Sequence, residues 1–315
     1  MTPARPSDRP AVLRSAPGPA SQSSLLEVVP ASFRANFNRR AFTINHHLSS
    51  HPLFSLPQLT ELSRRLPKEF IQYNSGEVSV ETGLYKGPQT GLSIEETIRR
   101  IEQCKSWMVI KFIENDPLYR ELLDQCLDEV AVLSEPLAPG MRMRQGFIFI
   151  SSPLSTTPYH MDHEYNFLLQ IRGAKELHVF DGSDRSILSE RELEEFFASG
   201  AATNITYNES IARKSEAFSL TPGCGLHIPV TAPHWVQNGD EVSISFSITF
   251  RTRVSDYRNI VYTANSKLRK WGVNPAPYGR SPWRDSMKWY GYRALRRARS
   301  TFHKRQAPTP TADHR

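Results

Sequence analysis

The sequence predicts a mainly β protein with α-helical elaborations, built around a sandwich or small barrel of short strands. From about residue 141 to 255, short strand-like runs are separated by Gly, Pro or Asp. Few helix patterns lie between these runs, although a parallel α/β fold needs a helix between successive strands. The chain of 315 residues is 39% hydrophobic and 23% charged, which is ordinary for globular protein and allows one large domain or two small ones.

Composition divides the chain into four segments. Residues 1–24 contain five prolines and no apolar run, so we expect a disordered segment and no secretory signal. Residues 25–140 read as a mixed α/β elaboration, and residues 141–255 as the β core. Residues 256–315 read as a basic, helical C-terminal tail.

The elaboration carries several local signals. The alternation in 41–48 predicts a strand, and a short helix ends at Pro67. Ser93 and Glu96 form a capping-box pattern at the start of a second helix. The strongest helix pattern of the chain begins at Pro117.

The core segment consists of strand patterns with one helix pattern, at 189–200, among them. The expected strands are 144–151, 166–173, 175–182, 225–230 and 241–252. In the last strand, one face carries Val242, Ile244, Phe246, Ile248 and Phe250. The opposite face carries Ser243, Ser245, Ser247 and Thr249.

Positive charge is concentrated near the C-terminus. The net charge is +7, but 267–305 holds twelve Lys/Arg against Asp285, so this segment carries +11 and the rest −4. Such a helix either binds a polyanion such as RNA or has a merely solvated basic face. Its apolar face is expected to pack on the core or on a second subunit, as in a homodimer, through Trp283, Met287, Tyr290 and Leu295.

Two further features concern the compartment. No run approaches the ~18 apolar residues that span a membrane. Cys104, Cys126 and Cys224 are odd in number and widely spaced, which gives neither a disulfide framework nor a CxxC pair. A reducing, cytoplasmic location is therefore expected.

The residues that carry chemistry begin at His160. On a strand, residues i and i+2 point to the same side, so His160 and Asp162 can direct an imidazole and a carboxylate at one point. A third ligand from a late strand would complete the two-His, one-carboxylate facial triad typical of non-heme Fe(II) sites. His234 is the expected third ligand and His227 is its competitor. His163 is out of phase with the pair and should point away from the metal.

The other histidines in strand patterns are expected to have structural roles. His46 and His47 lie in an early strand, where a packed or exposed role is the better interpretation. His178 lies within the strand pattern at 175–182 and is expected to be structural.

Residues 157–162, Thr-Pro-Tyr-His-Met-Asp, belong to a longer pattern that resembles the JmjC family of Fe(II)/2-oxoglutarate oxygenases. The resemblance is closest to asparaginyl-hydroxylase-type JmjC hydroxylases and covers about 146–250, a third of the chain. It departs from the pattern at Ser247, where those hydroxylases tend to place Asn. The other matching residues are Asn166, Phe167, Gln170, Ile171, Gly173, Lys175, Ile228, Pro229 and His234.

The resemblance implies a double-stranded β-helix (cupin/jelly-roll) core. It also implies Fe(II) held by His160, Asp162 and His234, with 2-oxoglutarate and O2 as cosubstrates. Lys175 and Thr157 would meet the far carboxylate of 2-oxoglutarate, and Asn166 and Ser247 would complete the cosubstrate site.

The implied reaction is hydroxylation of a protein side chain, a peptide or a small metabolite. Two alternatives stay open. The same oxidant can remove N-methyl groups and release formaldehyde. A cupin-fold binding or regulatory protein would keep the fold without turnover.

Overall fold

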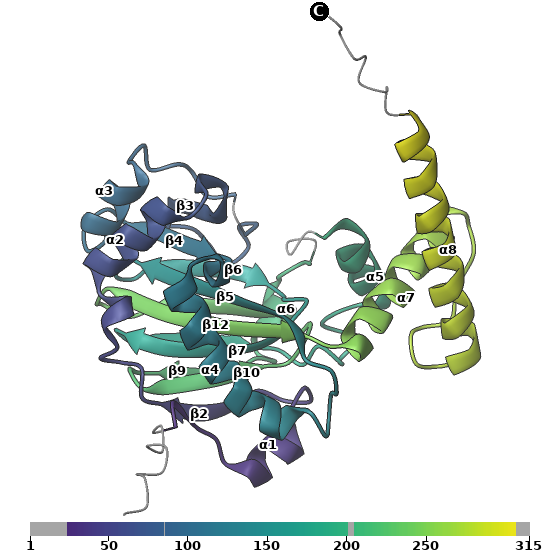
Figure 1. The fold of residues 1–315 in the computed structure, drawn as a ribbon, viewed down its shortest axis with the longest axis horizontal. Coiled ribbons are helices and arrows are strands. Elements are labelled where there is room, and N and C mark those ends of the chain that lie inside the picture. Colours follow the sequence, from purple (N-terminus) through teal and green to yellow (C-terminus); the bar gives the residue numbers. More distant parts are fainter. Residues whose placement is uncertain (1–23, 85, 201–204, 307–315) are drawn as a thin grey trace, which may run out of the picture.

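The computed structural model describes residues 24–84, 86–200 and 205–306. The segment predicted to be disordered, 1–24, lies outside the described residues except for Ser24. Two antiparallel sheets pack face to face as a jelly roll, with helices on the outer face of the larger sheet and at one end (Figure 1). The predicted double-stranded β-helix is confirmed.

The larger sheet has the order β1-β2-β10-β7-β12-β5-β4-β3 in the described part of the chain. Its strands are β1 (Leu26–Glu27), β2 (Phe42–His46), β3 (Ile71–Ser75), β4 (Ser106–Lys111), β5 (Arg142–Ser151), β7 (Tyr165–Arg172), β10 (Cys224–Ile228) and β12 (Ser243–Arg251). The sheet runs without a break across the predicted boundary at residue 140, because β4 pairs with β5.

The smaller sheet has the order β6-β11-β8-β9. Its strands are β6 (Thr156–His160), β8 (Lys175–Val179), β9 (Glu216–Leu220) and β11 (His234–Asn238). Leu177 and Val236 of this sheet pack against Leu168 and Ile228 of the larger one, which closes the sandwich around an inner core.

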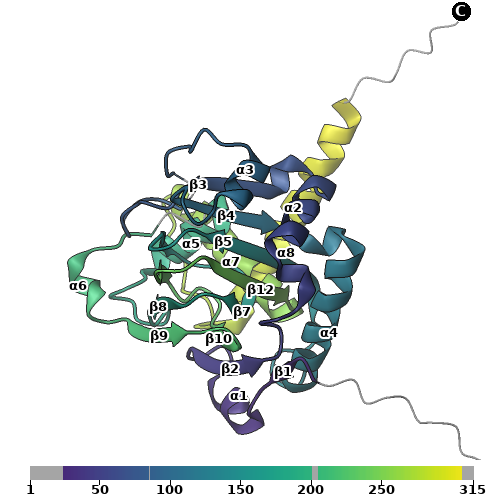
Figure 2. The same ribbon diagram turned by 90° about the vertical axis from the view of Figure 1, so that its left-hand side faces the viewer.

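Helices complete the two layers (Figures 1 and 2). Side chains of α1, α2 and α4 share one apolar core with the larger sheet, so these helices cover its outer face. Helices α5, α7 and α8 lie together at one end of the molecule (Figure 1). The bounds are α1 (Pro30–Asn36), α2 (Leu56–Arg65), α3 (Ile94–Arg99), α4 (Pro117–Ser134), α5 (Glu190–Ser199), α6 (Glu209–Ala212), α7 (Arg253–Lys270) and α8 (Pro282–Gln306), with 3₁₀ turns at Pro52–Phe54, Lys68–Phe70 and Ile113–Asn115.

The predicted helix starts are confirmed by their caps. The Ser93 side chain accepts from the Glu96 N–H, and the Glu96 side chain returns to the Ser93 backbone, so the capping box is present. Helix α4 begins at Pro117, and Asp116 accepts from the N–H groups of the first turn. Asp116 also pairs with Arg65 at 2.6 Å, which joins the start of α4 to the end of α2.

Strand β12 alternates as predicted, but both of its faces are buried. It lies in the middle of the larger sheet, between β7 and β5, with helices on one side and the smaller sheet on the other. The hydroxyl-bearing residues are therefore inside the protein. Ser245 donates to Gln170 and Ser247 donates to Asn166, so the polar face of this strand belongs to the interior of the sandwich.

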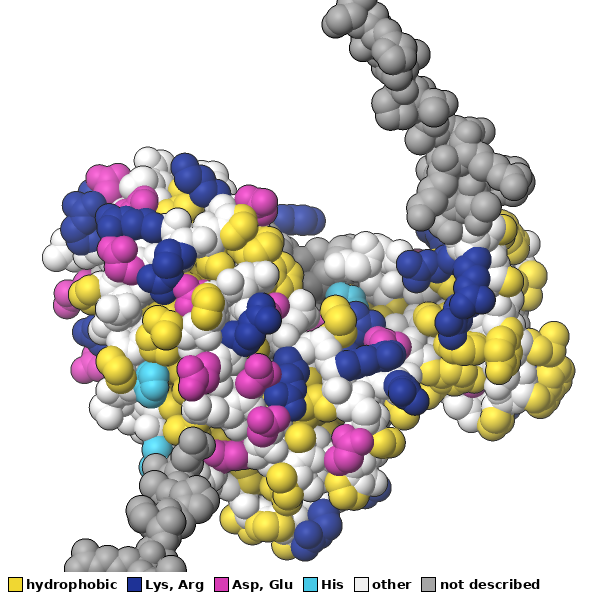
Figure 3. All heavy atoms as spheres, in the orientation of Figure 1, with side chains coloured by type: hydrophobic (Ala, Val, Ile, Leu, Met, Phe, Trp, Pro, Cys, Tyr) yellow, Lys and Arg dark blue, Asp and Glu magenta, His cyan; other side chains and the backbone are white. Residues whose placement is uncertain are grey.

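The apolar face predicted for the C-terminal helix is exposed. Trp283 is 62%, Met287 64%, Tyr290 68% and Leu295 41% exposed, so packing of these residues on the core is wrong. Helix α8 instead contacts α7 through its other side, where Trp289 meets Tyr257. Figure 3 shows hydrophobic side chains gathered over this end of the molecule. Contact with a second subunit or a polyanion stays a prediction.

Within the described ranges, every helix is too short or too polar to cross a lipid bilayer. The cytoplasmic location expected from the sequence is not tested and stays a prediction.

Candidate metal centre

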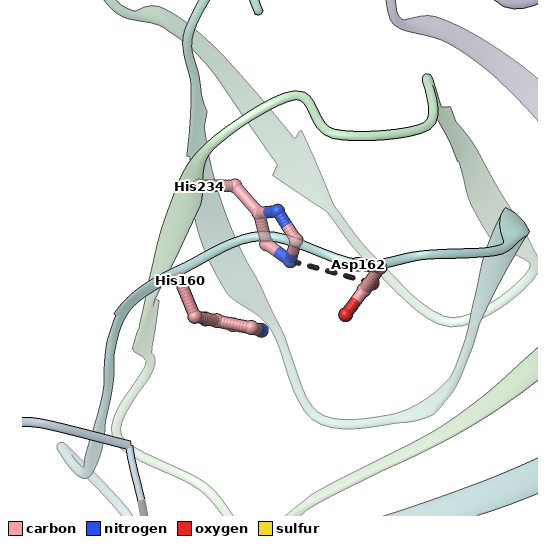
Figure 4. A group of neighbouring side chains, drawn as sticks. All are labelled: His160, Asp162 and His234. Atoms are coloured by element: carbon pink, nitrogen blue, oxygen red, sulfur yellow. Dashed lines mark ion pairs between the residues drawn. The ribbon is translucent and has the colours of Figure 1, made fainter. Parts of the chain in front are cut away.

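The smaller sheet brings three potential metal ligands together. His160 ends β6, His234 begins β11, and the two are directly opposite in the antiparallel register. Asp162 follows β6 by two residues, and its Oδ2 lies 3.9 Å from Nε2 of His234. One ligand atom from each residue lies within 4.8 Å of the others. Figure 4 shows both imidazole rings and the carboxylate directed at one point, as the i, i+2 spacing predicted.

Backbone hydrogen bonds set the orientation of both rings. Nδ1 of His160 lies 2.7 Å from the Pro158 carbonyl, and Nδ1 of His234 lies 3.0 Å from the Ala232 carbonyl. Because a carbonyl only accepts, each Nδ1 must carry the proton. In the neutral form of each ring, Nε2 then keeps its lone pair, which is the arrangement that metal-ligating histidines need. Burial lowers the pKa of His160 to about 4, so its ring stays neutral at ordinary pH.

Asp162 is held by a chain of hydrogen bonds that starts in the larger sheet. Ser247 of β12 donates to Oδ1 of Asn166 at 2.8 Å, and Nδ2 of Asn166 donates to Oδ2 of Asp162 at 2.9 Å. The position of Asp162 is therefore set by both sheets. Asn166 and Ser247 also line the cavity described next, so a role in binding the cosubstrate stays a prediction for both.

A cavity of about 110 Å³ adjoins the three ligands, between the two sheets. Its lining comes from both layers, with His160, His234 and Val236 on one side and Phe147 and Phe149 on the other. The further lining residues are Leu84, Trp107, Val109, Thr157, Asp162, Glu164, Asn166, Leu168, Lys175, Ile228, Ser247 and Thr249. The cavity therefore combines apolar walls with a few converging polar groups, as small-molecule sites do.

Lys175 is the cationic group of this cavity. It is only 7% exposed, and no hydrogen bond or ion pair joins its Nζ to the described residues. Burial lowers the pKa of its ammonium from 10.5 to about 7. A buried ammonium without a partner is costly, and an anionic ligand would supply the partner. Thr157, which also lines the cavity, adds a hydroxyl group.

Both ring nitrogens of His227, the other candidate for the third ligand, have hydrogen-bond partners away from the cluster. Nδ1 of His227 donates to the Asn166 carbonyl at 3.0 Å, and its Nε2 accepts from the Asn38 N–H at 3.0 Å. Its ring packs among Phe37, Phe42 and Phe167. Of the two candidates for the third ligand, the structure brings only His234 to the cluster.

The remaining histidines lie away from the cluster. His163 stacks on Phe196 of α5 at 4.0 Å, so it points away from the ligands but is packed and does not lie on an open surface. His46 is buried, and its Nε2 donates to the Gln170 carbonyl. His47 pairs with Glu27 on the surface, and His178 stacks on Trp235.

Glu164 is a cavity residue that the sequence patterns did not single out. Burial raises the pKa of its carboxyl to about 7. The available signal was its spacing, since Glu164 continues the i, i+2 series of His160 and Asp162. The aromatic walls Trp107, Phe147 and Phe149 gave no such signal, because alternating apolar residues also mark any half-buried strand.

Two antiparallel sheets with a His-x-Asp…His cluster between them define a double-stranded β-helix with a candidate metal cavity. Among solved structures, the X-ray structure of E. coli ycfD matches with a TM-score of 0.50 and 14% identity, covering 86% of this chain and 68% of that one. A crystal structure described as Escherichia coli ribosomal oxygenase YcfD gives 0.47 and 13%, covering 86% and 67%. YcfD in complex with cobalt and 2-oxoglutarate gives 0.46 and 15%, covering 82% and 61%.

At 14% identity, the likeness to ycfD establishes the fold alone. No family model and no curated protein matches this sequence.

Proposed function

We propose that this protein is an Fe(II)- and 2-oxoglutarate-dependent oxygenase, and specifically a hydroxylase. One observation carries the proposal. A two-His, one-carboxylate cluster and a buried, unpaired ammonium, that of Lys175, line the same cavity. A metal site alone would fit many enzymes. The combination of the cluster and the Lys175 ammonium fits a cosubstrate with a metal-chelating end and an anionic far end.

The donor set fits Fe(II). Two neutral imidazoles and one carboxylate on one side of the ion leave three positions for other ligands, which is the facial arrangement of non-heme Fe(II) oxygenases. His160, Asp162 and His234 would hold the ion. With 2-oxoglutarate and O2, the bound ion would supply the two-electron oxidation of a C–H bond to C–OH, coupled to conversion of 2-oxoglutarate to succinate and CO2.

The chain's own residues bind and orient the cosubstrate. Val179 lies opposite His234 and Lys175 lies opposite Asn238, so the backbones of His234 and Lys175 are four residues apart along β8 and β11. At ~3.3 Å per residue this is about 13 Å, a gap for the lysine side chain and an extended dicarboxylate to bridge. Thr157, which pairs with Val236 between these levels, would add a hydroxyl donor to the far carboxylate.

The cavity walls have a second role, which is to exclude water. Phe147 and Phe149 of β5 and Leu168 of β7 face the polar ligands across the sandwich. An apolar wall strengthens the electrostatic contacts inside and limits unproductive side reactions. The proposed substrates are a protein side chain, a peptide or a small metabolite that presents a C–H bond at the mouth of this cavity.

The test is succinate formation from 2-oxoglutarate by the full chain with Fe(II) under air, screened against peptide, ribosomal and small-molecule pools. His234→Ala should abolish it. His178→Ala is the matched control and should retain it, since His178 stacks on Trp235 outside the cavity. Formaldehyde in step with succinate would identify N-demethylation instead. Absence of succinate in all pools, with the metal bound, would favour a non-catalytic cupin-fold protein.

A further inference from the structure

A second hollow, of about 430 Å³, lies outside the metal cavity and shares no lining residue with it. Its lining includes residues 38–41 before β2, residues 179–183 at the end of β8, residues 229–232 before β11, and side chains of helix α7. Arg185, Leu193, Lys214, Glu216 and Tyr278 complete it. We call it the basic pocket.

The basic pocket is rich in positive charge. Its lining includes Arg39, Arg40, Arg185, Lys214 and Arg258, against the carboxylates of Asp181 and Glu216. Asp181 is already engaged, because its carboxylate accepts from the backbone N–H and the hydroxyl of Ser183. No ion pair or side-chain hydrogen bond joins Arg39 or Arg40 to the described residues. A concave site with such an excess of cations attracts anions.

Arg258 has buried hydrogen-bond donors that a ligand would satisfy. Its Nε and Nη2 are buried and have no hydrogen-bond partner among the described residues. Its guanidinium lies 5.9 Å from the centre of the Phe197 ring and close enough to Tyr262 and Tyr278 for its charge to act on both hydroxyls. Buried guanidinium donors without acceptors are costly, and their planar fork matches the oxygens of phosphate.

One carboxylate could compete for these donors. Oε1 of Glu190 accepts from Arg185 at 2.6 Å, but its Oε2 is buried without a partner, and its charge also acts on Tyr262. A direct pair between Arg258 and Glu190 is therefore the competing arrangement. That pair would leave Arg39 and Arg40 at the pocket without an anion, whereas Lys214 already pairs with Asp184 at 3.4 Å.

We propose that the basic pocket binds a small phosphate monoester. The terminal phosphate lies at Arg258, where a monoester offers three unsubstituted oxygens, whereas a backbone diester offers two. The organic part lies along the apolar wall of Leu193, Phe180 and Tyr278. A volume of about 430 Å³ is within the range of small-molecule sites and larger than inorganic phosphate needs.

The pocket borders the metal centre through one loop. Thr231 lines the pocket, and its N–H donates to the Asp162 carbonyl at 3.0 Å. Ala232 lines it too, and its carbonyl accepts from His234. The ligand thus lies behind the loop that orients two candidate metal ligands, without entering their cavity.

The experiment is titration calorimetry of the metal-free full chain with adenosine 5′-monophosphate, adenosine and inorganic phosphate. The monophosphate should bind, adenosine should not, and Arg258→Met should weaken binding at least about tenfold. Arg40→Gln, at the exposed rim, should weaken it by a smaller factor and guards against a folding defect in the first variant. Arg253→Gln, on the exposed side of the same helix, is the matched control and should bind normally.

Three results would overturn the proposal. The first is no binding of any phosphate probe at millimolar concentration. The second is equal affinity in wild type and Arg258→Met. The third is binding that is lost in Lys175→Met and kept in Arg258→Met, since that would place the anion in the metal cavity. Tighter binding of a single-stranded RNA than of the monophosphate, abolished by Arg258→Met, would show a nucleic-acid site instead.

Discussion

Replacing Lys175 with methionine removes the ammonium from the wall of the metal cavity and keeps a side chain of similar length. This side chain is 7% exposed, and burial lowers the pKa of its ammonium from 10.5 to about 7. The substitution should therefore change two measurable quantities in opposite directions, the affinity for 2-oxoglutarate and the stability of the ligand-free protein.

Affinity should fall. A hydrogen bond between charged groups contributes roughly 1.5–3 kcal/mol, so the dissociation constant of 2-oxoglutarate should rise by about one to two decades. Metal affinity should change much less, because Lys175 is not a member of the metal cluster.

Stability should rise. Between pH 7 and 10.5 the unfolded chain holds a proton on Lys175 that the ligand-free folded protein has lost, so stability increases with pH in this window. Below pH 7 the cost is fully present, and at 1.36 kcal/mol per pH unit it is on the order of 5 kcal/mol. Lys175→Met removes this cost, so the ligand-free variant should be more stable than wild type, by the largest margin below pH 7.

The assays are calorimetric titration of 2-oxoglutarate into the Mn(II)-loaded protein and urea unfolding of the ligand-free protein from pH 6.5 to 9. Lys267→Met, an exposed change on α7, serves as the control and should alter neither quantity. Unchanged 2-oxoglutarate affinity together with equal or lower stability would refute the reasoning, since it would make Lys175 a solvated lysine.

Three other predictions concern the metal ligands, their support and the tail. Asn166→Ala removes the donor to Asp162 and should weaken Mn(II) binding about 10–100-fold, as loss of a hydrogen bond to a metal ligand does. His234→Ala should weaken it further, while His178→Ala should not, and equal affinities in all three by calorimetry would exclude this metal site. Truncation at about Arg280 should leave uncoupled 2-oxoglutarate turnover intact and should lower RNA affinity, measured at two salt concentrations, or change the oligomeric state seen by light scattering. Loss of turnover in a folded truncated protein would place the tail in the catalytic unit.

The clustering of the candidate metal ligands could be predicted in part because the signal of the first two is local. The prediction that His160 and Asp162 share one side depends only on the alternation of side chains along a strand. The two side chains do lie together, although β6 ends at His160 and Asp162 lies just beyond it. The choice between His227 and His234 could not be made with certainty from spacing. His227 is engaged because its Nε2 accepts a hydrogen bond from the Asn38 N–H, and Asn38 is 189 positions away in the sequence.

Long-range pairing explains what the sequence did not reveal. The N-terminal elaboration supplies both edges of the larger sheet, since β1 and β2 lie at one edge and β3 and β4 at the other. A local sequence pattern does not indicate which distant strand a segment will pair with. Helix α7 lies almost wholly in the segment predicted to be a helical tail, but its bounds were not predicted for a similar reason, because its buried side depends on α5 and α8 being beside it. Ser247 was placed correctly in phase, but its hydrogen bond to Asn166 depends on the register of β12 with β7.

The pairing of β2 with β10 has a consequence for synthesis of the chain on the ribosome. Asn45 pairs with Cys224, so about 180 residues must be added before β2 meets the partner that joins it to the rest of the sheet. At about 5–20 residues per second, this takes roughly 10 to 40 s. Strands β3, β4 and β5 are neighbours in sequence and can pair much earlier. During the interval Phe42 and Ile44 lack the strand β10 that places them in the sheet, so β2 is an unpaired edge that a chaperone would protect.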